Sequence, residues 1–574
     1  MRLLWALIAN LIRLLLLPLT WLRRTFAAPR GSWLLLELDG AVVEIAGRRP
    51  FWDRRPRPLS IQQLRQVLAL AREDSHVVGL VVACESFDAG PATAESLRQV
   101  LVEFQASGKQ LVCYLPRGGG ARAWYLASAA SRIFVGTDAL VEPLGFSIQS
   151  PYLGQLLDRV EVDREVLARG RFKTAAEPLL ERAMSEAQRE QLGAYLDALS
   201  QSLVDALASS RGVTPSAARE WIDGGPWTAR EALERGMCDA VLHVDEVPTT
   251  LDPSRSDGAV LVPVFGYGAR RAVRFVPLRP SPHLAVLPLQ GAIVSEAPGS
   301  FVPMAEEKEL VEACRKLWAD SRVRGVVLVV NSQGGSALAS ERIRRALERL
   351  GSRKPLVAYL SNVAASGGYL AAVAAPTIVA QPTTLTGSIG VIAARLSVGR
   401  ILGRVGVAVQ VEKRGEHADI YSPARTTSES ERARLEHYVD DAYESFLAAV
   451  AAGRKLERDA VHAVAQGRIW SGRDAKERGL VDRLGGFDAA LAALRDQLGP
   501  KSHAWEPKVV GRRRGPSPLA QILVRASGVQ VPAGALGSVV RSGVGALAPL
   551  LFDSEARAYA LCASVAAPYD AVDG

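Results

Sequence analysis

Short apolar runs alternate with stretches of helical periodicity along most of the chain. Apolar runs at residues 79–84 and 325–330 are each followed by an amphipathic stretch, at 94–104 and 340–350. Continuous apolar runs are typical of strands that are buried on both faces of a parallel sheet. The pattern therefore predicts an α/β architecture, in which amphipathic helices cover a mainly parallel sheet.

Further elements of the same kind are predicted in both halves of the chain. Strands are predicted at 33–40, 110–115 and 132–135 in the first half, and at 284–291, 355–360 and 377–380 in the second. Helices are predicted through Tyr125 and Tyr369, and long helices over 185–210 and 428–452. Each half thus has the same elements in the same order.

The two halves also match residue by residue, at an offset of 244 to 245 positions. A chain of 574 residues exceeds what one hydrophobic core usually organises, so two large domains are expected. We predict one repeat at 31–250 and a second at 281–498, joined by a linker rich in Pro, Arg and Gly at 251–280. Residues 499–574 form a C-terminal extension to which the sequence assigns no role.

The most apolar stretch of the chain covers residues 3–22 and has about the length that crosses a bilayer. Arg13 interrupts it, and on a helix Arg13 shares one stripe with Arg2 and Arg24, because eleven residues make almost three whole turns. A spanning helix and a helix lying in the membrane interface both fit this pattern. We therefore predict residues 1–30 to be a membrane anchor or interfacial helix.

Charge and cysteine content exclude several classes of function. The net charge of +9 comes from scattered arginines without an aromatic-basic recognition motif, so no nucleic-acid partner is expected. The five cysteines form no CxxC pair and have no histidines at ligand spacing, which argues against a metal site and a disulfide framework. No cofactor motif is present, and we expect neither a metal nor a cofactor.

Lysine is scarce, with only 10 of the 69 basic residues. Between residues 31 and 250 the only lysines are Lys109 and Lys173. Arginine cannot act as a base in a protein, whereas a desolvated lysine can. Taken alone, Lys173 is typical of a solvated surface residue, so its environment decides its role.

Ser366 follows a predicted strand and precedes a predicted helix, flanked by small residues. Such an elbow presents a hydroxyl at the helix amino terminus, where free N–H groups favour a developing negative charge. Helix capping is an equally simple role for this serine. Upstream, Gly334 and Gly335 form a glycine turn after a strand, which fits either an oxyanion hole or an ordinary turn. The first copy has an acidic residue, Asp88, in that turn.

A serine nucleophile needs a base, and the two copies divide the candidates between them. Ser366 of the second copy is matched by Arg122 of the first, while Lys173 of the first copy is matched by Ala418 of the second. His417 adjoins the position equivalent to Lys173 and is the histidine that could serve instead. A hydroxyl thus lies in one copy and an amine in the other.

Four sequence motifs, taken in order, resemble those of the signal peptide peptidase A family in its long, duplicated form. They are 172–178 in the first copy and 332–336, 364–369 and 385–390 in the second, and the likeness covers residues 31 to about 498. Members of that family are membrane-anchored serine-lysine proteases with a crotonase-like fold that is distantly shared with the Clp protease. The resemblance implies that Ser366 attacks the peptide carbonyl, that neutral Lys173 removes its proton and that Ser388 orients the amine.

The resemblance also implies which backbone amides receive the oxyanion, namely those of Gly334, Gly335 and Gly367. Gln333 departs from the family pattern, which usually has proline there. A lysine, with a solution pKa near ~10.4, acts as a base at neutral pH only if burial lowers that pKa by several units. An apolar cleft would do this and would also accept apolar side chains beside the cut.

As substrates, the resemblance implies signal-peptide remnants and other apolar, unfolded peptides. It further implies a homotetrameric bowl at the bacterial cytoplasmic (inner) membrane, with the catalytic domains on the extracytoplasmic side. Two alternatives stay open at this point. One is a crotonase-like acyl-CoA enzyme, which uses the same oxyanion turn, and the other is a catalytically silent membrane scaffold built by duplication.

Overall fold

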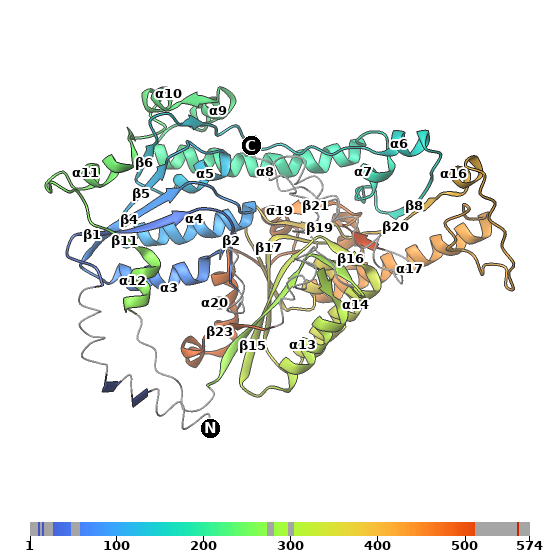
Figure 1. Cartoon of the computed structure of the whole chain (residues 1–574). Coiled ribbons are helices and arrows are strands. Elements are labelled where there is room, and N and C mark those ends of the chain that lie inside the picture. The colour runs from blue at the N-terminus through green and yellow to red at the C-terminus, as the bar shows by residue number, and fades with distance from the viewer. Residues whose placement is uncertain are drawn as a thin grey trace. The chain divides into compact units, whose positions relative to one another are not determined.

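The computed structural model describes residues 10–11, 14–15, 27–46, 58–271, 281–296, 304–510 and 559–561. The predicted membrane segment at 3–22 therefore lies almost entirely outside the described residues. Within the described ranges, no helix combines the length and the hydropathy that a bilayer crossing requires. Figure 1 shows the chain with its helices and strands labelled.

The described residues divide into two compact units. Those up to Ser147 and from Leu199 to Pro282 form unit 1, and those from Ile148 to Ala198 and from His283 onward form unit 2. The units do not follow the boundary between the sequence copies, because residues 148–198 belong to the first copy by sequence and to unit 2 by packing. Part of the predicted linker is also structured, as β11 (Leu261–Pro263) and α12 (Val264–Arg271).

Unit 1 contains a six-stranded parallel sheet with the order β10-β6-β5-β4-β1-β11. The bounds are β1 Ser32–Leu38, β4 Val77–Cys84, β5 Gln110–Leu115, β6 Arg132–Val135 and β10 Ala240–Val241. Along β4, Leu80 and Val82 pack into one hydrophobic cluster and Val81 into another, because neighbouring strand residues point to opposite faces. The larger cluster includes apolar residues of α3 (Ile61–Arg72) and α4 (Pro91–Gln105).

Unit 2 repeats this topology, with the parallel order β22-β18-β17-β15-β12-β23. The bounds are β12 His283–Gln290, β15 Val323–Ser332, β17 Leu356–Ala365, β18 Thr377–Ala380, β22 Arg483–Leu484 and β23 Pro507–Val509. Apolar residues of α13 (Glu307–Ala319) and α14 (Ala337–Gly351) pack in its main cluster. On the other face, Phe487 of α20 (Phe487–Leu498) contacts Tyr359 edge to face, with ring centroids 6.2 Å apart.

The two units share individual hydrogen bonds as well as the order of their strands. Lys109 of unit 1 donates a hydrogen bond to the carbonyl of Val77 at 2.6 Å. Its counterpart in unit 2, Lys354, donates to the carbonyl of Val323 at 2.9 Å. The first hydrogen bond joins the start of β5 to the start of β4, and the second joins the start of β17 to the start of β15. The predicted duplication of a mixed α/β module is therefore confirmed.

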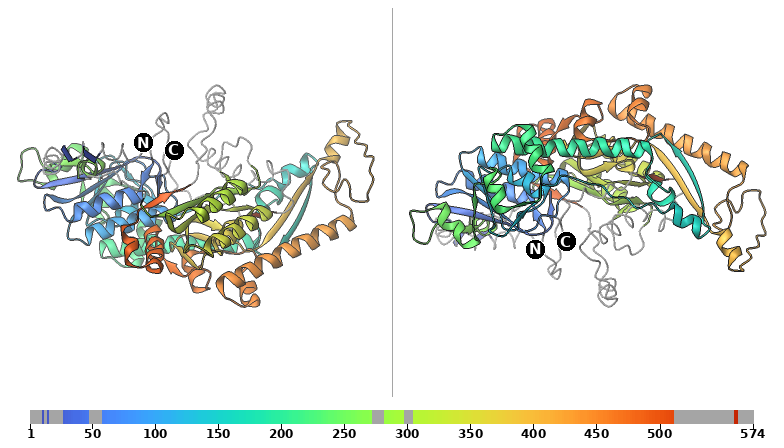
Figure 2. Two further views of the ribbon diagram at one scale, coloured as in Figure 1. Left: turned by 90° about the horizontal axis from the view of Figure 1, so that it is seen from below. Right: turned by 90° about the horizontal axis from the view of Figure 1, so that it is seen from above.

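A further sheet in unit 2 has the order β14-β13-β16-β24-β20-β8 and positions the candidate site. The bounds are β8 Asp163–Arg169, β13 Ala292–Val294, β14 Met304–Glu306, β16 Gly334–Ser336, β20 Val391–Ser397 and β24 Tyr559–Leu561. β8 comes from the first copy and β20 from the second, and they pair antiparallel over seven residues. They run side by side in Figures 1 and 2, and α17 (Glu429–Arg454) packs against both.

Candidate active site

Ser366 lies at a sharp elbow between β17 and α15 (Gly367–Ala372). Its φ of 54° is in the left-handed region, which a residue with a side chain occupies only when its surroundings enforce it. Its amide donates to the carbonyl of Gly387 at 2.8 Å, which fixes the elbow against β19 (Leu385–Gly387). Ser366 is the N-cap residue of α15, but its side chain forms no capping hydrogen bond and is free to serve another purpose.

Lys173 lies in the loop that connects β8 to α7 (Glu177–Leu180). The amide of Phe172, the preceding residue, donates to the carbonyl of Gln466 at 2.8 Å. Gly467 packs so closely on the loop that a Cβ atom there would lie 2.5 Å from the Lys173 nitrogen. The contacts of this loop with Gln466 and Gly467 thus fix the backbone from which the Lys173 side chain extends.

The Lys173 amine and the Ser366 hydroxyl meet inside unit 2. Lys173 Nζ lies 2.7 Å from Ser366 Oγ, 3.1 Å from Ser388 Oγ and 2.8 Å from the Ser388 carbonyl oxygen. The three residues are 4 %, 0 % and 2 % exposed, in the order Lys173, Ser366, Ser388. The structure therefore brings together the lysine and both serines that the sequence singled out.

Ser388 holds the amine from a second strained position. Its φ is 50°, and its amide donates to the carbonyl of Arg468 at 2.7 Å. Ser388 therefore offers Lys173 two oxygens from one rigid residue, which leaves the amine little rotational freedom. The three hydrogen-bond partners named for Lys173 are uncharged oxygens. Removing an ammonium group from water is costly, so burial of this kind disfavours the charged form of an amine.

The three predicted oxyanion glycines gather beside this pair. Gly334 and Gly335 form β16 with φ angles of 98° and 156°. Gly367 lies against them, since a Cβ atom placed on it would be 3.4 Å from the Gly334 Cα atom. The amide of Gly334 donates to Ser332 Oγ at 3.1 Å and is therefore already engaged. Gly367 opens α15, where an amide has no partner within its own helix.

Gln191, on α8 (Glu186–Arg211), is a supporting residue that the sequence interpretation missed. It is 2 % exposed, and its amide nitrogen donates to the Phe172 carbonyl at 3.0 Å and to Thr174 Oγ1 at 2.8 Å. Its amide oxygen accepts from the Ile469 amide at 3.1 Å. One side chain thus clamps the residues on both sides of Lys173. A glutamine within a long helical pattern gives no sequence signal for this role.

The other candidate residues lie elsewhere. His417 Nδ1 is 3.8 Å from a carboxylate oxygen of Glu431, and it is Lys173 that contacts Ser366. In unit 1, Arg122 donates to the carbonyl of Ala89 at 2.6 Å, and in unit 2 Ala418 is exposed. Across the described ranges, no cluster of three His, Cys, Asp or Glu side chains could hold a metal ion.

A strained, buried serine in contact with a buried lysine, on a duplicated α/β scaffold, is the arrangement of a serine hydrolase. Comparison with known proteins narrows that class. The model of peptidase family S49 matches residues 103–255 and 348–500, once in each copy. The chain belongs to peptidase family S49, and it is a serine-type endopeptidase. This membership assigns it to peptide hydrolysis instead of acyl-CoA chemistry.

Similar proteins match over most of their length. Protease 4 of Salmonella typhi is 30% identical over 496 residues, which cover 81% of this chain and 78% of that protein. Protease 4 of Haemophilus influenzae is 28% identical over a match that covers 82% of this chain and 79% of that protein. The chloroplastic serine protease SPPA of Arabidopsis thaliana is 29% identical over a match that covers 83% of this chain and 71% of that protein.

Proposed function

We propose that Ser366 is the nucleophile of this peptidase, that Lys173 is its general base and that Ser388 orients the lysine amine. The observation that carries the proposal is the buried 2.7 Å contact between Lys173 Nζ and Ser366 Oγ. In the proposed reaction, Ser366 Oγ attacks the peptide carbonyl carbon while its proton passes to the neutral amine. The resulting ammonium then gives that proton to the leaving nitrogen, so that the acyl-enzyme and the first product form.

The second half of the reaction reuses the same groups. A water molecule attacks the ester carbonyl of the acyl-enzyme, and Lys173 accepts one of its protons. Collapse of this second tetrahedral intermediate returns a proton to Ser366 Oγ and releases the second product as its carboxylic acid. The lysine is thus neutral at the start of each half-reaction and charged only while an intermediate exists.

The amides of Gly335 and Gly367 are the proposed oxyanion donors. Backbone donors that are fixed before the reaction stabilise the negative charge without reorganisation. Gly334 belongs to the same proposed group, but its amide must leave Ser332 Oγ before it can contribute. We therefore assign the principal role to Gly367. Gly335, which pairs with Ile293 of β13 and Ala560 of β24, is the second proposed donor, and Gly334 provides the tight backbone turn before it.

Apolar, unfolded peptides are the proposed substrates, with signal-peptide remnants in the cytoplasmic membrane as the class. A relative in Enterococcus faecium, which is 37% identical over 32% of this chain, is named a putative signal peptide peptidase and supports this choice. We further propose that residues 1–30 attach the protein to the bacterial inner membrane, with the catalytic domains on the extracytoplasmic side. A crotonase-like fold for both copies and a homotetramer belong to the same proposal.

Labelling with a fluorophosphonate, which reacts with activated serines, tests the assignment of the nucleophile. We expect mass spectrometry of the wild-type chain to find the adduct on Ser366, and the variant Lys173→Ala to form none at neutral pH. Labelling of a different serine, or full labelling of Lys173→Ala, would refute the pair. Cosedimentation with anionic vesicles, with and without residues 1–30, tests membrane attachment separately.

A further inference from the structure

Unit 2 has a strongly basic edge, formed by α13, α14 and the start of β15. Between residues 310 and 354, every exposed charged residue is an arginine or a lysine. These residues are Arg315, Lys316, Arg322, Arg324, Arg342, Arg345, Arg349 and Arg353. The acidic residues of the same stretch are all half-buried, namely Glu312, Asp320, Glu341 and Glu348. The stretch contains ten basic and four acidic residues, which give it a net charge of +6.

The internal duplication provides a reference for this charge. At the repeat offset, residues 310–354 are equivalent to residues 65–109. That segment of the first copy contains four basic and six acidic residues, so its net charge is −2. Both segments form a helix, a strand and a second helix, as α3, β4 and α4 in unit 1 and as α13, β15 and α14 in unit 2. The fold therefore does not require the basic charge, which indicates a function of the second copy.

The fold gathers part of this charge around one aromatic ring. α13 and α14 pack side by side, as Figure 1 shows. Arg349 and Arg353 lie over the ring of Trp318, with their guanidinium carbons 5.7 and 4.3 Å from its centroid. Burial lowers the pKa of Lys354, and repulsion from Arg353 and Arg324 lowers it further, so these two arginines lie near the same amine. We call the three arginines and Trp318 the arginine–tryptophan patch.

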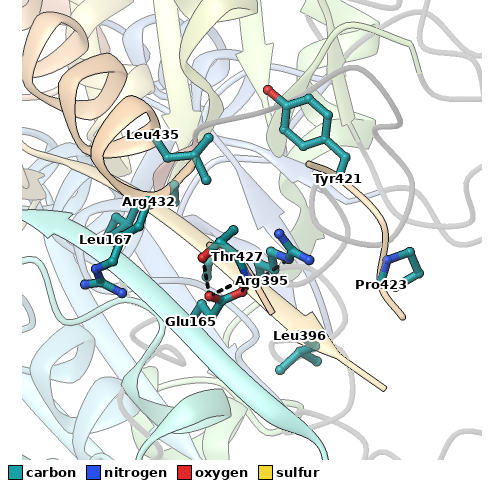
Figure 3. Close-up of a pocket in the computed structure, with 11 residues that line it drawn as sticks. Glu165, Leu167, Arg395, Leu396, Tyr421, Pro423, Thr427, Arg432 and Leu435 are labelled. Atoms are coloured by element: carbon teal, nitrogen blue, oxygen red, sulfur yellow. Dashed lines mark hydrogen bonds and ion pairs between the residues drawn. The ribbon is translucent and has the colours of Figure 1, made fainter. Parts of the chain in front are cut away.

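The arginines of the patch differ from other arginines of unit 2 in having no carboxylate beside them. Arg395, which lines the pocket in Figure 3, lies 3.4 Å from a carboxylate oxygen of Glu165, which balances its charge. Among the residues that the structure describes, no carboxylate forms an ion pair with Arg324, Arg349 or Arg353. The patch therefore presents three positive charges that an anionic partner can neutralise.

The exposed face of α14 extends the patch. Leu338, Arg342, Arg345 and Arg349 follow one another at spacings of four, three and four residues, which places them on one face of the helix. All four are exposed, Leu338 by 46 %. Eleven residues of a helix rise about 16 Å, so the basic face is much longer than a single small anion. Its shape suits an extended anionic surface.

We propose that this edge of unit 2 docks on the anionic headgroups of a phospholipid membrane, with the arginine–tryptophan patch at the centre of the contact. The planar guanidinium group of arginine matches a phosphate group with two parallel hydrogen bonds. Tryptophan favours the boundary between headgroups and acyl chains, because its ring is apolar and its N–H is polar. Basic side chains around an exposed aromatic ring thus match the chemistry of an anionic lipid surface.

The duplication also favours a membrane over other anionic partners. Residues 1–30, the proposed membrane segment, lead into β1, whose first residue Ser32 pairs with Val77 at the start of β4. The equivalent of Val77 in unit 2 is Val323, where β15 begins, and Arg324 of the patch follows it. The membrane segment therefore joins unit 1 at the edge of the module that is basic in unit 2. This argument rests on the proposed attachment through residues 1–30, whereas the argument from charge does not.

Docking at this edge sets the distance between the membrane and the candidate site. β15 begins at the basic edge with Val323 and ends with Ser332, beside the Gly334 turn. A strand of its ten residues is about 33 Å long. The proposed docking thus holds Ser366 about 30 Å from the headgroups. A peptide reaches the serine once it has left the bilayer, in keeping with an unfolded substrate.

Cosedimentation of the full chain with vesicles tests the docking. Wild type should bind vesicles of phosphatidylcholine and phosphatidylglycerol at least about tenfold more tightly than vesicles of phosphatidylcholine alone, and added salt should shrink the difference. Arg324→Gln combined with Arg349→Gln and Arg353→Gln should lose most of that difference, because each arginine near an anionic surface contributes roughly fivefold. Binding to the neutral vesicles reports on residues 1–30 and should not change, so failure of the proposed anchor is distinguishable from failure of the patch.

The matched control removes three exposed arginines of unit 1, with Arg219→Gln, Arg230→Gln and Arg235→Gln. Arg235 also lies over a tryptophan, with its guanidinium carbon 3.8 Å from the centroid of Trp227. This variant has the same net charge as the patch variant and should keep the preference for anionic vesicles. An equal loss in both variants, or equal binding of wild type to both kinds of vesicle, would refute the proposal. Tighter binding to double-stranded DNA than to anionic vesicles, abolished in the patch variant, would also refute it.

A fluorescent label tests the contact at the patch itself. Ser352 is exposed between Arg349 and Arg353, and the four cysteines that the structure describes are buried. In a Cys562→Ser background, Ser352→Cys labelled with the polarity-sensitive dye NBD should brighten when anionic vesicles are added. The same dye on Ser216→Cys, exposed on α9 (Pro215–Asp223) of unit 1, should not respond. A constant signal from Ser352→Cys under conditions where the chain cosediments would place the contact elsewhere and overturn the docking.

Discussion

Lys173 Nζ lies 2.7 Å from Ser366 Oγ, although 193 positions separate the two residues and each comes from a different copy of the module. Neither copy holds both groups, because Ala418 and Arg122 occupy the matching positions. The described contacts thus unite one amine and one alcohol in one chain. Duplication has produced two scaffolds but one proposed reaction centre.

Replacing the proposed nucleophile tests its role most directly. Ser366→Ala should lower the hydrolysis of casein or of an apolar peptide ester by at least about a thousandfold, because it removes the proposed nucleophile. Ser361→Ala removes another buried hydroxyl of the same strand and should leave most of the activity. Undiminished hydrolysis by Ser366→Ala would show that a different residue is the nucleophile.

The base is tested by a change that keeps positive charge. Lys173→Arg should be as inactive as Lys173→Ala, since a guanidinium group cannot accept the serine proton at neutral pH. Initial rates with the peptide ester measure the loss. His417→Ala should retain activity, because that imidazole lies beside Glu431. Full turnover by the arginine variant, combined with inactivity of His417→Ala, would make the histidine the base.

Gln191 should act through the position of the lysine. Gln191→Leu leaves the Ile469 amide without its buried side-chain partner, which costs about 1–3 kcal/mol. It also removes one of two hydrogen bonds to the Phe172 carbonyl, which still accepts from the Thr174 amide. We expect kcat to fall about tenfold or more, with a smaller change in KM and a cooperative unfolding transition that is retained. Gln201→Leu, on the same helix, is the control and should change neither constant. Equal activity of the two variants would show that the clamp is purely structural.

Complementarity of the copies can be tested by restoring a hydroxyl. Arg122→Ser, made in the inactive Ser366→Ala chain, should not restore hydrolysis, because the position that would supply its amine is Ala418. The assay is fluorophosphonate labelling followed by mass spectrometry, which detects even weak activation. An adduct on the new serine would mean that unit 1 contains an unrecognised base.

The ion pair between Arg425 and Glu431 predicts how the stability of the fold depends on pH. The hydrogen bond from Arg425 lowers the pKa of Glu431 from 4.5 to about 2. A carboxylate with a depressed pKa in the folded state stabilises the fold above its unfolded pKa, and this contribution is lost as the pH falls toward 2. Arg425→Ala should therefore lower the unfolding temperature at pH 7, and its difference from wild type should shrink between pH 4.5 and 2.

Much of the fold follows from local pattern, for physical reasons that particular elements show. The predicted bounds 110–115, 132–135 and 377–380 coincide with β5, β6 and β18, because continuous apolar runs have few alternatives to a buried parallel strand. β8 was not predicted. Its sequence is mostly polar, and it is a strand because β20 of the other copy pairs with it.

The candidate site also has features that the sequence predicts and features that it does not. The sequence predicts Ser366, Lys173 and Ser388 from a strand-to-helix elbow, a scarcity of lysine and a family resemblance. The strained φ angles of Ser366 and Ser388 and the clamp from Gln191 could not be predicted, because they depend on contacts between distant segments. The glycine turn at 334–335 was recognised, but its pairing as β16 with β13 was not, since glycine carries no strand signal.

Residues 148–198 belong to the first copy by sequence but pack in unit 2, and this bears on how the gene can evolve. A fission at the joint between the copies would give two polypeptides, one with the amine and the other with the alcohol. Neither product alone would contain both members of the proposed Lys173–Ser366 pair, so the proposed reaction needs both copies.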